Sequence, residues 1–188
     1  MKKPLSCCLF VLLLVAGAAV LGYFRLPDDY EIERRLEIAA SPAAVYAVVS
    51  DLHTWPEWTI WNPDLDPQAV FSFPEQESGS GARMSWTGPK MGQGDLVLLE
   101  CEAPRRVPYD VAMSEGQHRS QGWIEIEEVP GGSLVYWVHA GKFDGVVKLF
   151  GPWLDAALGQ QFEDSLMGLK ERVEPLIADP ASDDESHE

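Results

Sequence analysis

The sequence predicts an α+β fold in which a twisted antiparallel sheet wraps around one long C-terminal helix. Between residues 70 and 140, short runs with period-two alternation of apolar residues are separated by turn residues, which is typical of antiparallel strands. From residue 151 onward, apolar residues recur at spacings of three and four over about 25 residues, which is typical of an amphipathic helix. A sheet with one apolar face has to be covered, and this helix is the one predicted element long enough to cover it.

An apolar segment, residues 5–24, lies near the start of the chain and contains no charged residue. As a helix it would span about 30 Å, the thickness of the hydrocarbon core of a bilayer. Lys2 and Lys3 precede it, which predicts a single-pass membrane anchor with the domain outside the cytoplasm, in the periplasm if the source is bacterial. The small-x-small sequence at residues 16–18 leaves a cleaved signal peptide as the alternative.

Three segments follow from these patterns. Residues 1–26 form the anchor or signal peptide, residues 27–178 one globular domain, and residues 179–188 an acidic tail that we expect to be disordered. The chain carries 30 Asp and Glu against 14 Lys and Arg, for a formal net charge of −16 at pH 7. Because phosphate backbones repel such a domain, we expect no nucleic-acid binding.

The first elements of the domain are a strand and two short helices. Alternation predicts a strand over residues 30–38. Ser41 followed by Pro42 is typical of a helix start, which predicts a helix to about residue 51.

The second short helix is predicted around Pro56 and ends at Pro63. It carries Trp55, Trp58 and Trp61, whose spacing of three places all the rings on one side.

Strands and turns fill the middle of the domain. A Gly- and Pro-rich loop is predicted over residues 87–94, and residues 130–133 carry a strong hairpin signal. The predicted strands are residues 70–73, 83–86, 95–101, 107–113, 120–129 and 134–140. Their short connections predict an antiparallel meander.

Four local patterns and the order of elements resemble a known superfamily. The patterns are Ile38–Tyr46 (IAASPAAVY), Val49–Trp58 (VSDLHTWPEW), Gly81–Trp86 (GARMSW), and LGQQF at 158–162 with LMGLK at 166–170. Together they are similar to the SRPBCC, or START-like helix-grip, superfamily of polyketide cyclase/dehydrase and lipid-transport proteins, over about residues 30–177. The resemblance implies a deep apolar cavity between the sheet and the long helix. It also implies a hydrophobic ligand, and it supplies no universal catalytic residue.

The candidate cavity-lining residues are mostly aromatic and lie on the predicted strands, the second short helix and the long helix. They are Trp58, Trp61, Trp86, Tyr109, Trp137, His139, Phe162 and Leu166. The alternative for Trp55, Trp58 and Trp61 is packing of the short helix against the sheet, because aromatic stripes most often pack elements together. For the strand residues Trp86, Tyr109 and Trp137, the alternative is that the rings point outward and cover the sheet.

Three function hypotheses remain open at this stage. The first is a membrane-tethered binding domain for a hydrophobic small molecule or lipid. The second is a cyclase- or dehydratase-type enzyme that uses a cavity-facing group such as His139 or Tyr109. The third is a structural or protein-interaction domain with a filled cavity. The sequence lacks GxSxG, GxGxxG and P-loop motifs and any Cys/His cluster, so we expect no cofactor and no metal.

Overall fold

The computed structural model describes residues 22–74, 76, 78–114, 116–143, 149 and 151–175, with the backbone alone over 151–155. Nearly all of the predicted anchor, residues 5–24, and the whole predicted tail, residues 179–188, lie outside these residues. Within the described part of the chain, no helix is both long enough and apolar enough to cross a membrane.

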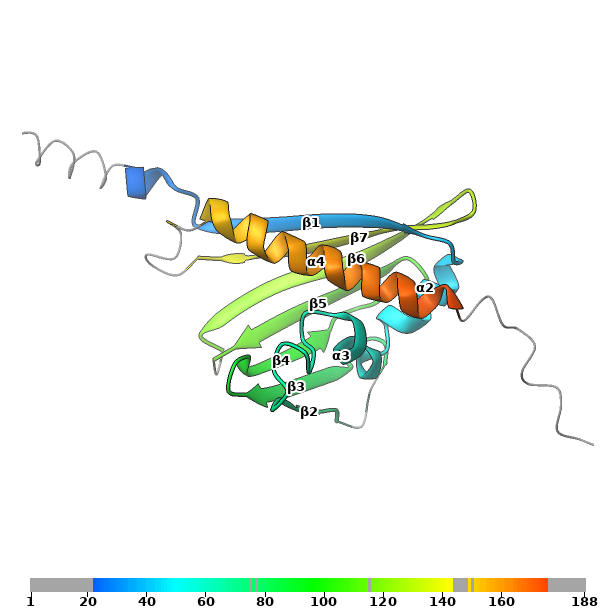
Figure 1. Ribbon diagram of the computed structural model, residues 1–188, viewed down its shortest axis with the longest axis horizontal. Helices are drawn as coiled ribbons and strands as arrows, with labels where there is room; N and C mark the ends of the chain where they lie inside the picture. The colour runs from blue at the N-terminus through cyan, green and yellow to red at the C-terminus, as the bar shows by residue number, and fades with distance from the viewer. Residues whose placement is uncertain are drawn as a thin grey trace, which may run out of the picture.

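Seven strands form one antiparallel sheet in the order β1-β7-β6-β5-β4-β3-β2, and the long helix α4 lies across one of its faces (Figure 1). The elements are, in chain order, β1 (Asp29–Ile38), α2 (Pro42–Val49), the 3-10 helix η1 (Leu52–Thr54), α3 (Trp55–Trp58), β2 (Val70–Ser72), β3 (Arg83–Gly88), β4 (Gly92–Leu98), β5 (Arg106–Met113), β6 (His118–Val129), β7 (Gly132–Lys142) and α4 (Gly151–Val173). This arrangement confirms the predicted α+β class, the antiparallel meander and the covering helix.

Local side chains set the starts of the short helices. The Ser41 hydroxyl accepts a hydrogen bond from the backbone N–H of Ala44 at 3.3 Å, and Pro42 opens α2. The Asp51 carboxylate accepts from the backbone N–H of His53 at 3.0 Å and caps η1. Asp51 therefore serves the backbone at a helix end.

Two predicted boundaries are wrong. Helix α3 is a single turn that ends at Trp58, because Thr59 is extended, and Trp61 therefore lies in the loop that follows. The predicted loop over residues 87–94 is mostly strand, since β3 continues to Gly88 and β4 starts at Gly92. Gly92 has φ +69°, and this left-handed conformation makes the connection tighter than its Gly and Pro content suggested.

Ion pairs and close packing hold α4 against the other elements. The Arg34 side chain on β1 reaches Glu163 on α4, with 2.8 Å between Nε and Oε1, and it crosses Gly159, where a Cβ would collide with the guanidinium. At the C-terminal end of α4, Arg172 pairs with Glu57 of α3. The long helix is thus held at its middle and at its C-terminal end, which helps to set the space between it and the sheet.

Candidate functional site

Part of the space between α4 and the sheet is packed solid by aromatic rings. Trp137 of β7 lies edge-on to Phe162 of α4, with 4.6 Å between ring centroids. The Trp55 ring packs edge-on against two further rings, with 6.1 Å between its centroid and that of Trp137 and 5.4 Å to that of Tyr109. We call this group the aromatic cluster; it comprises Trp55, Trp58, Trp61, Tyr109, Trp137 and Phe162. All six residues are buried, so this part of the interior leaves no room for a ligand.

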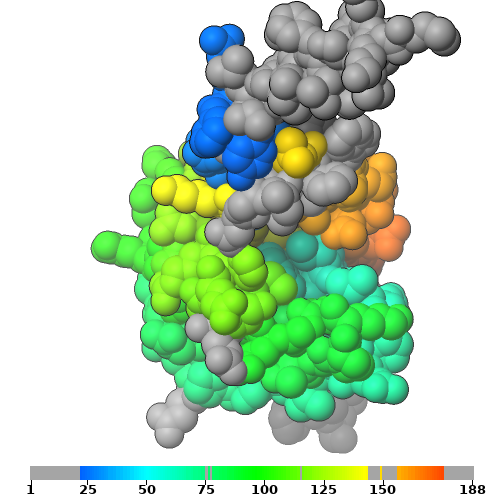
Figure 2. Space-filling model, turned by 90° about the vertical axis from the view of Figure 1, so that its left-hand side faces the viewer, coloured from blue at the N-terminus to red at the C-terminus, as the bar shows by residue number. Residues whose placement is uncertain are grey.

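Beside the aromatic cluster lies a cavity of about 330 Å³. Its described lining residues are Tyr30, Ile60, Trp61, Leu65, Trp86, Lys90, Met91, Val111, Met113, His118, Arg119, Ser120, His139, Lys142, Leu158, Gln161 and Phe162. Its exposed lining residues include His118, Arg119 and Lys142, which places its mouth at the end of the molecule where β6 starts and β7 ends. This end faces the viewer in Figure 2. Ligand pockets start at about 300 Å³, so the interior has room for a small molecule.

Four of the predicted site residues line this cavity: Trp61, Trp86, His139 and Phe162. The other four do not. Tyr109, Trp137 and Leu166 are fully buried in the core next to it, and Trp58 borders a separate groove. Ligand binding by any of the eight stays a prediction.

Glycines on neighbouring strands make room for the aromatic rings of the inner face. Three aromatic–glycine pairs are directly in register: Trp86 with Gly94, Tyr109 with Gly122, and Tyr30 with Gly141. At each glycine an added Cβ would collide with the partner ring. The ring of Trp86 therefore lies flat over β4, which keeps the cavity beside it open.

A hydrogen-bonded chain of three side chains leads from the core to the cavity. The Trp137 indole N–H donates to the Tyr109 hydroxyl oxygen at 2.8 Å. That hydroxyl lies 2.9 Å from Nδ1 of His139, so its own proton is available to donate to this nitrogen. In this arrangement His139 carries its proton on Nε2, which has no hydrogen-bond partner among the described residues and belongs to a ring that lines the cavity.

Burial keeps this chain uncharged at neutral pH. It raises the pKa of Tyr109 far above that of an exposed tyrosine. It lowers the pKa of His139 from 6.5 to about 4. The His139 imidazole that lines the cavity is therefore neutral at pH 7.

Trp86 presents a second donor. Its ring is 1 % exposed and lines the cavity, and its indole N–H has no hydrogen-bond partner among the described residues. An unsatisfied buried donor costs about 1–3 kcal/mol.

A comparison with family models matches residues 30–174 to the family described as polyketide cyclase / dehydrase and lipid transport. The chain belongs to this family. A comparison with curated proteins found no match.

Solved structures share the fold of this family member. Protein CV1439 from Chromobacterium violaceum is 18 % identical with a TM-score of 0.57, covering 79 % of this chain and 99 % of its own. The Aha1 dimer from Colwellia psychrerythraea is 18 % identical with a TM-score of 0.56, covering 77 % and 96 %. CalU16 from Micromonospora echinospora is 17 % identical with a TM-score of 0.51, covering 80 % and 87 %. Identities this low show a common fold alone.

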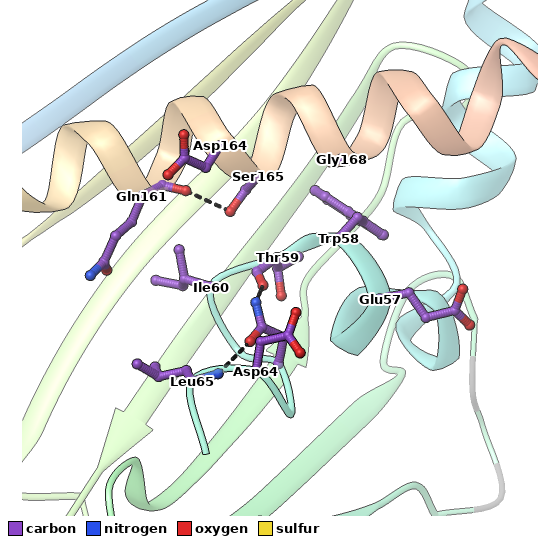
Figure 3. A pocket seen from close by; sticks show the side chains of 11 residues that line it. Glu57, Trp58, Thr59, Ile60, Asp64, Leu65, Gln161, Asp164, Ser165 and Gly168 are labelled. Atoms are coloured by element: carbon purple, nitrogen blue, oxygen red, sulfur yellow. Dashed lines mark hydrogen bonds between the residues drawn. The ribbon is translucent and has the colours of Figure 1, made fainter. Parts of the chain in front are cut away.

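A second hollow, separate from the cavity, lies between α4 and the loop after α3 (Figure 3). We call it the acidic groove. It has a volume of about 350 Å³, is bordered by α4 through Ser165 and Gly168, and is lined by the carboxylates of Glu57, Asp64 and Asp164. No Lys or Arg is among its described lining residues.

Sequence patterns gave no signal for Asp66, which supports the cavity wall. It is 1 % exposed, and its carboxylate accepts hydrogen bonds from the backbone N–H groups of Lys90 at 2.7 Å, Met91 at 3.0 Å and Gln68 at 3.2 Å. Burial raises the pKa of Asp66, but these hydrogen bonds outweigh it and the net pKa is lowered. Asp66 thus ties the β3–β4 turn to the loop after α3.

The remaining lining residues missed by the sequence are polar groups at strand ends and turns, including Lys90, Arg119 and Lys142. Alternation predicts the face of the sheet on which a strand residue lies. It does not predict whether that residue lies next to the cavity or beyond its end, so Arg119 and Lys142 were missed. No group of three metal-ligating side chains occurs in the described part of this family member.

Proposed function

We propose that this protein is a membrane-tethered binding domain that holds a hydrophobic small molecule in the cavity between α4 and the sheet. The observation that carries the proposal is the cavity itself. It has about 330 Å³ of space bordered by apolar side chains, next to an interior that is otherwise filled with rings. Such mostly apolar hollows with a few placed polar groups are typical of small-molecule sites.

The position of the cavity mouth supports exchange of the ligand with a membrane. Strand β1 begins at Asp29, five residues after Phe24, where the predicted anchor ends. Five residues reach at most about 18 Å. Asp29 pairs with Lys142, which lines the cavity. The start of the described chain and Lys142 therefore lie at the same end of the molecule, where β1 starts and β7 ends (Figure 1). If the anchor is retained, the mouth stays close to the bilayer.

The protonation states favour binding over catalysis by proton transfer. An efficient general acid or base has a pKa near the working pH. The pKa of His139 is lowered to about 4 and that of Tyr109 is strongly raised, so neither group exchanges protons readily near pH 7. The same neutral states suit fixed hydrogen bonds to a ligand.

A cavity-filling variant tests the proposal. The full chain is reconstituted in neutral phosphatidylcholine nanodiscs and titrated with the uncharged fluorophore 1-aminoanthracene, with empty nanodiscs subtracted. Val111 is 2 % exposed and lines the cavity, so we expect Val111→Phe to weaken dye binding at least tenfold. Val97 alternates with the buried face of β4 and borders no described pocket, so Val97→Phe should bind like the wild type. Equal binding by all three proteins, or no binding by the wild type, would contradict the proposal.

A further inference from the structure

The cavity mouth has the opposite charge to the rest of the chain. Lys90, Arg119 and Lys142 are all exposed and line the cavity. None of the described lining residues is Asp or Glu. The chain as a whole carries 30 acidic against 14 basic residues, so a patch of this size without a carboxylate is unexpected from composition. We call Lys90, Arg119 and Lys142 the cationic mouth.

These three cations make no ion pair within the described part of the fold, although ion pairs occur at Arg34, Arg105, Lys170 and Arg172. A group of like charges on one rim repels itself, and the buried Asp66 carboxylate attracts only one of the three, Lys90. An anion at the mouth would offset this repulsion.

The interior adds hydrogen-bond donors to these charges. The Trp86 ring lines the cavity and its buried indole N–H has no partner among the described residues, and His139 offers Nε2–H when Nδ1 accepts from Tyr109. Both are donors without an acceptor role in these states. These two groups match oxygen acceptors, whereas Tyr30, Ser120 and Gln161, which also line the cavity, can both donate and accept.

We infer that the ligand is an anionic amphiphile, with an apolar body in the cavity and a carboxylate or phosphate head at the cationic mouth. This inference rests on the proposed function and specifies its ligand class. The volume holds roughly eleven non-hydrogen atoms at about 30 Å³ each, as for liquid water. A ten-carbon chain is therefore a suitable probe.

The test compares three probes with the same chain and different heads: decanoate, decan-1-ol and decyl phosphate. Each displaces 1-aminoanthracene from the full chain in phosphatidylcholine nanodiscs at pH 7.5. Every affinity is expressed as the ratio of variant to wild type, so partitioning of the probe into lipid cancels. The variant is Arg119→Gln with Lys142→Gln, and the control is Arg83→Gln, an exposed cation on the opposite face of β3.

The double variant should bind decanoate about tenfold more weakly, because one exposed ion pair changes an equilibrium by up to about fivefold. Its affinity for decan-1-ol and the affinities of Arg83→Gln should stay within about twofold of the wild type. Added NaCl should weaken decanoate binding and leave decan-1-ol binding unchanged. Of decanoate and decyl phosphate, the probe whose affinity ratio the double variant lowers more identifies the head group.

Two failures are distinguishable. If decan-1-ol and the dye bind but the double variant changes no ratio, the anionic head is wrong and the binding function stands. If neither the dye nor any probe binds the wild type, the binding function itself is wrong.

Discussion

The cavity and the acidic groove are neighbours of similar size with opposite chemistry. Both border α4, and both are lined by Ile60, Leu65 and Gln161. The cavity runs inward between aromatic rings and carries cations at its mouth. The groove lies between α4 and the loop after α3, and carries three carboxylates. Volume alone would not separate them.

What separates them is how each is built. At the cavity, the Trp86 ring packs directly over Gly94, and the buried Asp66 carboxylate holds the wall by accepting backbone hydrogen bonds. The buried Trp86 indole N–H has no hydrogen-bond partner among the described residues. In the groove, hydrogen bonds are made among its own residues: Ser165 donates to the Gln161 carbonyl, and Asn62 donates to the Thr59 carbonyl and accepts from the Leu65 N–H (Figure 3). The cavity thus has a polar group without a hydrogen-bond partner next to apolar space, whereas the polar groups named in the groove bond to one another. This difference favours the cavity as the binding site.

The largest effect is expected from the pH dependence of His139. Burial lowers its pKa from 6.5 to about 4, so the unfolded chain binds the proton more tightly. This contribution to stability is complete above pH 6.5 and is lost as the pH falls towards 4. The difference between the two pKa values corresponds to about 3 kcal/mol of unfolding free energy between neutral and strongly acidic pH. Urea unfolding of the full chain at pH 7 and pH 4.5 should show that His139→Gln loses less stability on acidification than the wild type.

His53→Gln, at an exposed histidine, is the matched control variant, and His139→Gln should lose less stability on acidification than this control does. An unchanged pH dependence in His139→Gln would mean that the imidazole is not buried as described.

The next effect compares the same substitution in the two hollows. At Gly94 an added Cβ would collide with the Trp86 ring, so Gly94→Ala should destabilise the protein by about 2 kcal/mol. At Gly168, beside the groove, the nearest atom is the Trp58 carbonyl oxygen at 3.2 Å. There the better helix propensity of alanine offsets the tight contact, so Gly168→Ala should stay within about 1 kcal/mol of the wild type.

Urea unfolding measures both changes. Equal stability of the two variants would mean that the Trp86 ring is free to move off β4.

The smallest effect compares two aspartates. Asp66→Asn weakens the hydrogen bonds that hold the backbone of Lys90 and Met91, so hydrogen exchange of these amides should accelerate. Because the pKa of Asp66 is lowered, its contribution to stability is present above the ordinary value of 3.8 and is lost as the pH falls through the lower folded value. Asp64→Asn, in the exposed groove, should leave the exchange of both amides unchanged. Equal acceleration in the two variants would remove Asp66 as the support of the wall.

The sequence predicted the fold, and four of its eight candidate residues line the cavity, for physical reasons that individual residues illustrate. Period-two alternation placed Trp86 and His139 on the inner face, and helical spacing did the same for Phe162. Alternation could not tell that Trp137 does not line the cavity. Trp137 lies on the same face of the sheet as His139, but the rings of Trp55 and Phe162 in the aromatic cluster pack against it. Lys90 was missed because it lies in a turn, where no periodicity applies.

Intermolecular NOEs between bound decanoate and the full chain, with selectively labelled methyl groups and ¹³C-labelled Ser and Gly, test the central claim most directly. The account predicts contacts from the alkyl chain to the methyl groups of Val111 and Leu158, which line the cavity and not the groove. Contacts confined to Ser165 and Gly168 of the acidic groove, or none at all, would contradict it.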